Sequence, residues 1–347
     1  MRHVVVISTG GTIASRWQGD GYAAEAAGQE VLAAGAVPED VEVRVVDLFT
    51  VNSSRLTTDH QLRLLHAVHE VLADPAVDGV VVTHGTDTLE ESAFFLDLFH
   101  GDRRPVVFTG AQQPLDATDG DAAGNLYDAL LTAATGRDIG AVIVFAGQVF
   151  AARGTVKQHT VDARAFGTPD GLPLGRVEFG RVTWGRRRPR PEPLPMPEVG
   201  VVPPRVDIVM HHSDGDTVLF DASLAAGAQG VVLVGTGAGN ANPQVAEAVR
   251  RAVESGVQVA VSTRVAAGAV APLYTGGGAV DLVAAGALLA GTLRPGQARI
   301  ALLATLLATR ASGSGSDDAA AVLRRVLEAA PQAIPASELY LVDGVGK

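Results

Sequence analysis

Residues 4–12 of the chain read VVVISTGGT, and residues 79–88 read GVVVTHGTDT. In each stretch a short apolar run rich in β-branched residues, which is typical of a buried strand, leads into a glycine-rich turn that carries threonine hydroxyls. In open α/β sheets, ligands bind beyond the carboxyl ends of the strands, in a crevice lined by such turns and by the amino ends of the following helices. The two stretches therefore predict one ligand site built from two similar turns.

Strand-like and helix-like patterns alternate along the rest of the chain. Further apolar, β-rich runs lie at 41–46, 105–108, 140–145, 206–210, 230–234 and 257–262, with a weaker one at 268–270, and helical spacing occurs at 58–72, 90–99, 122–134, 243–254, 299–307 and 317–329. This alternation predicts βαβ crossovers, and hence an α/β fold with a mostly parallel sheet covered by helices on both faces.

A proline-rich segment divides the chain. A length of 347 residues exceeds what one hydrophobic core usually holds, so we expect two domains. Prolines cluster between Trp184 and Pro204, where they cannot sustain a helix or a sheet ladder. We therefore predict a larger N-terminal α/β domain over 1–184, which also carries both threonine turns, a semi-rigid linker over 185–205 and a smaller C-terminal α/β domain over 206–347.

The composition argues against several kinds of chemistry and partner. The formal charge of −11 disfavours nucleic acid, because phosphate binding draws on clustered positive charge. The lack of cysteine excludes disulfides, zinc–thiolate sites and a cysteine nucleophile. No residues show a metal-ligand spacing, so neither a metal nor another cofactor is expected. With no apolar run long enough to span a bilayer and no secretion signal at its start, the chain is expected to be soluble, cytoplasmic and without a membrane partner.

Lysine is almost absent, which draws attention to Lys157. Apart from the terminal Lys347 it is the only lysine, and the remaining 25 basic residues are all arginine. Unlike arginine, lysine can lose its proton when it is desolvated, so a solitary internal lysine is a candidate for acid–base chemistry. The alternative is an ordinary surface lysine.

Both turns carry residues that could form a nucleophilic site. A threonine hydroxyl is a poor nucleophile at neutral pH and needs a base, which Asp87 and Lys157 could supply together. Helix capping would explain the same threonines, and Asp87, without catalysis. A phosphate cradle is the weaker alternative, because neither GxGxxG nor Walker spacing is present. His84 could be a base or a ligand, although a lone histidine at a strand end is more often structural.

Eight motifs connect the chain to a known family. They are TGGTIA (9–14), HGTDT (84–88), TGAQ (109–112), DG (119–120) with NLY (125–127), Arg153 with Lys157 four positions later, GxGNxN (237–242), STRV (262–265), and LxP (293–295) with AR (298–299). In this order they resemble the signature segments of the bacterial-type L-asparaginase and glutaminase family, from residue 4 to about residue 308.

The resemblance implies a catalytic role for several of these residues. Thr12 would attack the side-chain amide carbon of asparagine, giving a β-acyl-enzyme and ammonia, after which water would release aspartate. Tyr22 resembles the lid tyrosine that polarises the Thr12 hydroxyl. Thr86, Asp87 and Lys157 would form a second triad that activates the attacking group and moves protons. Backbone amides of the Thr86 turn would suit an oxyanion.

Substrate binding is also implied by the resemblance. Ser53 matches the serine that binds the α-carboxylate, with Ser54 beside it, and Asp87 would pair with the α-ammonium, next to Thr86. Asn242 matches an asparagine that completes the pocket from a neighbouring subunit. The resemblance thus implies L-asparagine as the small-molecule substrate, and a homodimer or homotetramer whose active sites are completed across subunits.

The chain departs from the family pattern at three places. Residues 266–278 contain no acidic residue, where some members have one that contacts the α-ammonium, so binding of the amino group is expected to be weaker. Ser54 stands where secreted high-affinity members have glutamine, and Gly154 stands where an aspartate is common. These departures favour the cytoplasmic type over the periplasmic one. They leave glutaminase side activity open, because one methylene is discriminated by only about 1–3 kcal/mol.

Other functions compete with this interpretation. The amidase subunit of a tRNA-dependent amidotransferase resembles the family but has an extra N-terminal domain, whereas this chain starts on its first strand. A non-catalytic amino-acid sensor could use the same fold, although the two threonines and the lone lysine favour catalysis. A Rossmann-type dehydrogenase lacks support, since the glycine fingerprint is missing.

Overall fold

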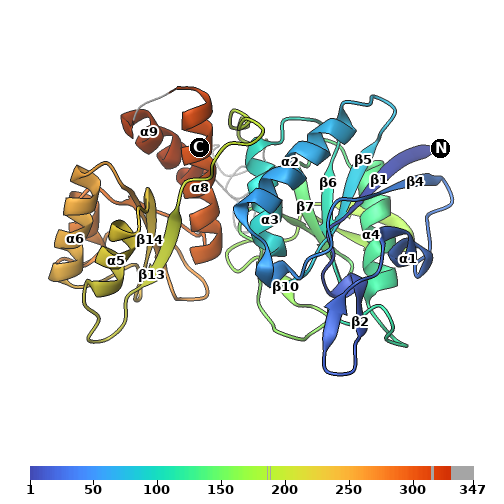
Figure 1. Ribbon diagram of the computed structural model, residues 1–347, viewed down its shortest axis with the longest axis horizontal. Helices are drawn as coiled ribbons and strands as arrows, with labels where there is room; N and C mark the ends of the chain where they lie inside the picture. Colours follow the sequence, from blue (N-terminus) through green and yellow to red (C-terminus); the bar gives the residue numbers. More distant parts are fainter. Residues whose placement is uncertain (186, 188, 314–315, 330–347) are drawn as a thin grey trace, which may run out of the picture. The chain divides into compact units, whose positions relative to one another are not determined.

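The computed structural model describes residues 1–185, 187, 189–313 and 316–329. The described chain forms two compact units, the first over Met1–Glu192 and the second beginning at Pro193. Each unit has its own sheet and its own helices (Figure 1). The fold class predicted from the sequence, a larger mostly parallel α/β unit followed by a smaller α/β unit, is confirmed.

An eight-stranded sheet forms the centre of the larger unit, as far as the described residues show. Its order is β12-β11-β8-β7-β6-β5-β1-β4. The strands are β1 (Arg2–Ser8), β4 (Val41–Asp47), β5 (Gly79–Thr83), β6 (Val106–Thr109), β7 (Ala141–Phe145), β8 (Gln148–Ala151), β11 (Gly175–Glu178) and β12 (Arg181–Trp184). The five strands from β4 to β7 pair in parallel, and the three at the other edge pair antiparallel.

Helices cover both faces of this sheet, which explains the continuous apolar strands. The helices are α1 (Gly28–Ala33), α2 (Thr58–Leu72), α3 (Leu89–Phe99) and α4 (Ala122–Thr135), with short 3₁₀ turns η1 (Thr12–Ala14) and η2 (Ser53–Arg55). Val4 and Val6 pack with residues of α4 in one cluster. In Figure 1, α2 and α3 lie on one side of the strands and α1 and α4 on the other. Successive residues of β1 are therefore buried whichever face they point to.

Two small antiparallel ribbons extend from the larger unit. One pairs β2 (Ser15–Trp17) with β3 (Tyr22–Ala24), and the other pairs β9 (Val156–Lys157) with β10 (Phe166–Gly167). The alternating pattern did not predict these ribbons or the antiparallel edge of the large sheet, because strands of two to four residues are too short to show a period.

The smaller unit is built on a parallel sheet that, within the described part of the chain, has four strands in the order β13-β14-β15-β16. Its elements are β13 (Val206–Met210), α5 (Val218–Ala225), β14 (Gly230–Gly235), α6 (Pro243–Glu254), β15 (Gln258–Thr263), α7 (Ala279–Ala284), β16 (Leu288–Leu289), α8 (Pro295–Ala311) and α9 (Ser316–Glu328). Helix α8 contacts three of the strands, and α9 packs on α8. No helix of the described residues is both long enough and apolar enough to cross a bilayer.

The predicted strand at residues 268–270 is wrong. Gly268 has a φ of 95°, which breaks an extended conformation. Val270 is buried, and its N–H donates to the carbonyl of Gly291 at 3.0 Å, but the segment joins no ladder. The apolar run reflects burial of a loop rather than a strand.

Close backbone packing brings together the two glycine-rich turns. Gly11 has φ 85° and ψ −173°, a conformation open almost only to glycine. A Cβ atom on Gly11 would overlap the Cα and N atoms of Gly85. A Cβ on Gly85 would in turn lie 2.6 Å from Oγ of Ser53. The glycines of both motifs are therefore required so that the turns after β1 and β5 can touch.

We predict that Gly11→Ala strongly destabilises the larger unit. Overpacking and the disfavoured backbone conformation together should cost about 2–5 kcal/mol of unfolding free energy. Gly19→Ala is the matched control, because Gly19 also has a positive φ of 97° but has no atom within 4 Å of the position of an added Cβ. Urea unfolding of both variants measures the difference. Equal stability of the two variants would contradict the close packing of the turns.

Candidate active site

Three segments of the larger unit meet at the carboxyl ends of β1 and β5. Thr12 begins η1 directly after Gly11, and Thr86 follows Gly85. Because the backbones of these two glycines are in contact, the two threonines are attached to neighbouring points of the backbone. Ser53 is buried against Gly85, and its carbonyl accepts a hydrogen bond from Oγ1 of Thr88 at 2.9 Å. The strand order explains this meeting, because β1 and β5 are neighbours in the sheet.

Lys157 connects to this group through its side chain. Its Nζ donates to Oγ1 of Thr86 at 2.8 Å and to Oδ1 of Asp87 at 2.9 Å. The lysine side chain is 16% exposed, whereas that of Asp87 is 62% exposed and Thr86 is buried. One ammonium group therefore reaches a buried hydroxyl on one side and a solvent-facing carboxylate on the other.

The backbone of Lys157 is held by a residue that the sequence did not single out. Oε2 of Glu90, in the first turn of α3, accepts a hydrogen bond from the N–H of Lys157. Burial raises the pKa of Glu90 to about 7, and the nearby charge of Glu91 acts in the same direction. The N–H of Lys157 and its ammonium charge oppose this rise. The only signal in the sequence was an acidic residue soon after HGTDT, which is also what a helix amino end attracts.

A second network supports the Thr86 turn from β6. Oγ1 of Thr86 donates to Oε1 of Gln112 at 3.4 Å. The N–H of Gln112 donates to both carboxylate oxygens of Asp121, at 3.1 and 3.0 Å. Nδ2 of Asn125 donates to Asp121 at 3.1 Å and to the carbonyl of Gly110 at 3.0 Å. The TGAQ and NLY motifs are thus parts of one hydrogen-bonded support.

His84 has a structural environment. It is fully buried, and its Nδ1 hydrogen-bonds to the carbonyl of Gly85 at 2.7 Å. Burial lowers the pKa of His84 to about 4, while the bond to Gly85 opposes this change. Nε2 of His84 has no hydrogen-bond partner among the described residues. A neutral histidine that orients the carbonyl of Gly85 fits these contacts better than a general base does.

The remaining predicted site residues lie in different surroundings. Tyr22, on β3, is 55% exposed, and its ring packs edge-on against Trp17 at 5.1 Å between centroids. The hydroxyl of Tyr22 makes no hydrogen bond to any described residue. Ser54 is exposed in η2, next to buried Ser53. Among the described residues, no hydrogen bond joins Tyr22 or Ser54 to the Lys157 cluster, which consists of Thr86, Asp87 and Lys157.

Asn242 belongs to the smaller unit, where it caps helix α6. Its Oδ1 accepts from the N–H of Val245 at 2.9 Å, and its Nδ2 donates to the carbonyl of Gly215 at 2.7 Å. Pro243 occupies the first turn of the helix, as is favourable there. The GxGNxN motif therefore has a structural function within this unit, and each end of the Asn242 amide keeps room for one further hydrogen bond.

A pocket of about 340 Å³ opens beside Lys157. It is lined by Asp87, Glu90, Lys157, Gln158, His159 and Thr160. The ion pair of Asp87 with Lys157 and the partly buried Glu90 carboxyl thus both border a space that reaches solvent. Nowhere in the described ranges do three or more histidine or acidic side chains come together in a way that could hold a metal ion.

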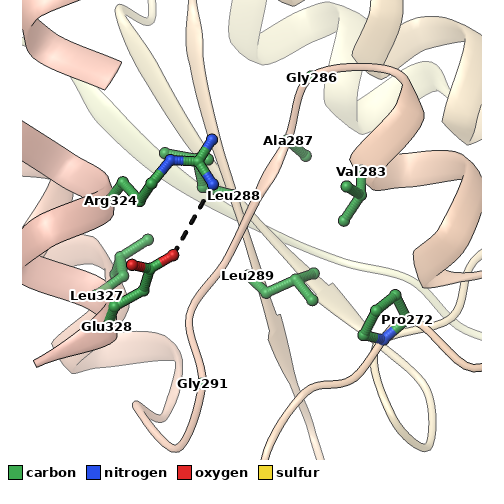
Figure 2. A pocket seen from close by; sticks show the side chains of 10 residues that line it. All are labelled: Pro272, Val283, Gly286, Ala287, Leu288, Leu289, Gly291, Arg324, Leu327 and Glu328. Atoms are coloured by element: carbon green, nitrogen blue, oxygen red, sulfur yellow. Dashed lines mark ion pairs between the residues drawn. The ribbon is translucent and has the colours of Figure 1, made fainter. Parts of the chain in front are cut away.

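The smaller unit contains a second hollow, shown in Figure 2, of about 360 Å³. Leu288 and Leu289 of β16 line one side of it, and Leu327 of α9 lines another. Its charged groups are Arg324 and Glu328, which pair with each other at 3.8 Å. The lining of this hollow contains no nucleophile, and its only carboxylate, Glu328, is paired with Arg324. The Lys157 cluster therefore remains the candidate active site.

Comparisons with known proteins agree across both units. Residues 3–190 match the family model for the N-terminal domain of asparaginase, and residues 205–318 match the model for the glutaminase/asparaginase C-terminal domain. An L-asparaginase of Bacillus licheniformis is 35% identical over 317 residues, which cover 90% of this chain and 97% of that protein. A glutaminase-asparaginase of Pseudomonas aeruginosa is 31% identical over 286 residues, or 77% of each chain. The crystal structure of a probable cytoplasmic L-asparaginase from Campylobacter jejuni superimposes with a TM-score of 0.83 at 28% identity, covering 94% of this chain and 99% of that one.

We predict that His84 makes the protein less stable in acid. The pKa of His84 is lowered from 6.5 to about 4, so between these values the unfolded chain binds a proton that the folded chain does not. Stability should fall as the pH drops from about 6.5 towards 4, by up to about 3 kcal/mol from this residue. Urea unfolding at several pH values measures the slope. In His84→Asn the slope of unfolding free energy against pH should become smaller, by an amount that corresponds to at most one bound proton. An unchanged slope would contradict the lowered pKa of His84 as its cause.

Proposed function

The chain belongs to the asparaginase family of amidohydrolases, and we propose that it hydrolyses L-asparagine to L-aspartate and ammonia through an acyl-enzyme on Thr12. The observation that carries this proposal is the cluster of Thr86, Asp87 and Lys157, held against the turn of Thr12 by the contact of Gly11 with Gly85. A hydroxyl nucleophile, a carboxylate and an amine that can exchange protons are groups that amide hydrolysis through an acyl-enzyme uses.

In the first half of the proposed reaction, Oγ1 of Thr12 attacks the side-chain amide carbon of asparagine. The C–O bond forms as the Thr12 hydroxyl gives up its proton, which the cluster of Thr86, Asp87 and Lys157 would pass to the leaving nitrogen. The tetrahedral intermediate then collapses with loss of ammonia. Backbone N–H groups of the Thr86 turn would stabilise the oxyanion, a contribution worth a few kcal/mol in such sites. The product of this half is a β-aspartyl ester on Thr12.

In the second half, water attacks the ester carbon and releases aspartate. Thr86 and Lys157 are suited to orient this water and relay its proton, because Nζ of Lys157 lies 2.8 Å from the Thr86 hydroxyl. In the neutral amine form, Lys157 would take the Thr86 proton as that hydroxyl takes the proton of the water. The exposed carboxylate of Asp87 stabilises the ammonium from the solvent side. Thr12 regains its proton when the ester bond breaks, so the enzyme returns to its starting state.

We infer that the same residues select an amino acid as the substrate. The hydroxyl of Ser53 would bind the α-carboxylate, with Ser54 at the rim, and Asp87 would pair with the α-ammonium. Tyr22 sits on a ribbon that follows the Thr12 turn directly, so closure of this ribbon would bring its hydroxyl to Thr12. Such closure is common where a substrate must be shielded from water.

We infer further that the protein is a homodimer or homotetramer that acts in the cytoplasm. Asn242 of the partner subunit would complete each substrate site. The missing acid within 266–278 removes one partner for the α-ammonium, so weaker binding of asparagine is proposed. Glutamine is proposed as a slower second substrate, because a single methylene is discriminated by only about 1–3 kcal/mol. A tRNA-dependent amidase subunit and a non-catalytic sensor draw no support from the relatives described above.

Ammonia release from purified protein tests the proposed function. L-asparagine, L-glutamine and D-asparagine should be supplied separately from micromolar to millimolar concentrations. We expect turnover of L-asparagine with half-saturation in the upper part of this range, and slower turnover of L-glutamine. A folded protein that releases ammonia from none of the three would overturn the proposal and favour a sensor.

We predict that Thr12→Ala lowers kcat by a factor of at least about 10³, because the acyl-enzyme cannot form. Lys157→Met should lower kcat by about 10²- to 10⁴-fold through lost proton transfer. Thr135→Ala, at an exposed threonine of α4, is the matched control and should retain wild-type kcat. Circular dichroism checks the fold of each variant. Near wild-type turnover in Thr12→Ala or Lys157→Met would show that the assigned roles are wrong.

A further inference from the structure

We propose that Glu90 is a positioning residue of this site, whose carboxylate holds the backbone of Lys157 so that the lysine ammonium reaches Thr86 and Asp87 together. The catalytic meaning of this inference rests on the proposed function, but the contact itself does not. The proposal adds Glu90 to a cluster in which the other groups act through their side chains.

The strand that carries Lys157 has little support of its own. β9 consists of Val156 and Lys157 alone, paired with the equally short β10. The N–H of Gln158 donates to the carbonyl of Ala165, at 2.6 Å, so the adjacent pair of Lys157 and Phe166 is a non-hydrogen-bonded pair of the antiparallel ladder. The N–H of Lys157 therefore points away from β10, and Glu90 is the group that receives it.

Glu90 lies on the element that fixes the other half of the cluster. Thr86 and Asp87 sit in the turn before α3, and Glu90 is in the first turn of that helix. Its hydrogen bond thus ties Lys157 to the same short segment that presents the two partners of the lysine ammonium. The backbone N–H and the side-chain ammonium of Lys157 are thus both held by residues of the segment 86–90.

The charges around Glu90 determine how this contact responds to pH. Asp87 and Glu91 are the acidic neighbours on its own segment, and Lys157 and His159 face it across the pocket from β9 and the residues that follow. Burial raises the pKa of Glu90 to about 7. A carboxylate accepts a stronger hydrogen bond than a protonated carboxyl does, so the hold on Lys157 should weaken as the pH falls through about 7.

Selective labelling of lysine observes this contact directly. Because Lys157 and Lys347 are the only lysines, a protein grown with ¹⁵N-lysine shows two labelled backbone amides, and Lys347→Arg identifies which is which. We expect the amide proton of Lys157 to titrate with a midpoint near 7 and to stop titrating in Glu90→Gln. A pH-independent signal, or a titration that persists in Glu90→Gln, would overturn the proposal. The spectra need no substrate, so they test the contact even if the proposed reaction is wrong.

Steady-state kinetics on L-asparagine test the consequence for catalysis. At pH 8.5 we expect Glu90→Ala to lower kcat by about 10²-fold, the cost of a misplacement of about 1 Å, with KM changed far less. Glu90→Gln keeps a hydrogen-bond acceptor of the same shape, so it should have a kcat close to that of the wild type at pH 8.5. In the wild type we expect kcat to decline below about pH 7 as Glu90 becomes protonated, and this decline should be absent in Glu90→Gln. Glu91→Gln, which removes a neighbouring charge of the same helix turn, is the control and should keep wild-type kcat.

Two results would contradict the positioning role. One is wild-type kcat in Glu90→Ala. The other is a loss in Glu90→Gln equal to that in Glu90→Ala, because restoring the acceptor would then restore nothing. Glu90→Gln preserves the shape of the side chain, so its readings stand even if Glu90→Ala fails to fold. An active wild-type protein whose Lys157 amide ignores Glu90 would leave the proposed function intact and remove this inference alone.

Discussion

The contact between the backbones of Gly11 and Gly85 is the constraint on which the rest of the candidate site depends. Neighbouring parallel strands end about 5 Å apart, which normally leaves room for side chains between their turns. Here neither turn has a side chain at the point of contact, and Ser53 closes against the same glycine. Two hydroxyl-bearing turns and a serine therefore begin from one compact piece of backbone.

Lys157 completes this arrangement from a distant part of the chain. Its ammonium contacts Thr86 and Asp87, while its N–H is held by Glu90. Because the lysine side chain is mostly buried, its charge costs desolvation energy that the ion pair with Asp87 must offset. Misplacing the ammonium would therefore cost more free energy than the ion pair by itself contributes, because a partly buried charge without its partners is strongly unfavourable.

The ionisable groups near the site differ because their surroundings differ. His84 is buried and Glu90 is partly buried, and this burial moves their pKa values in opposite directions, to about 4 and about 7. The reason is that burial disfavours whichever form is charged, the protonated histidine and the deprotonated glutamate. At neutral pH the site therefore contains a neutral histidine that supports the Gly85 turn and a carboxyl group poised to change its charge, which gives the two residues distinct functions.

Local sequence determined the five parallel strands of the larger sheet, three of the four described strands of the smaller sheet, most of the long helices and the identity of the hydroxyl-bearing turns. These features follow from periodicity, capping and glycine content within short stretches. The apolar run at 268–270 misled, because burial alone does not distinguish a loop from a strand. The short ribbon of Lys157 and the role of Glu90 were decided by tertiary structure, since their hydrogen bond joins residues 67 positions apart. A glutamate in a first helical turn has the same sequence pattern whether it faces water or a strand, and only the packing of β9 against that turn distinguishes the two.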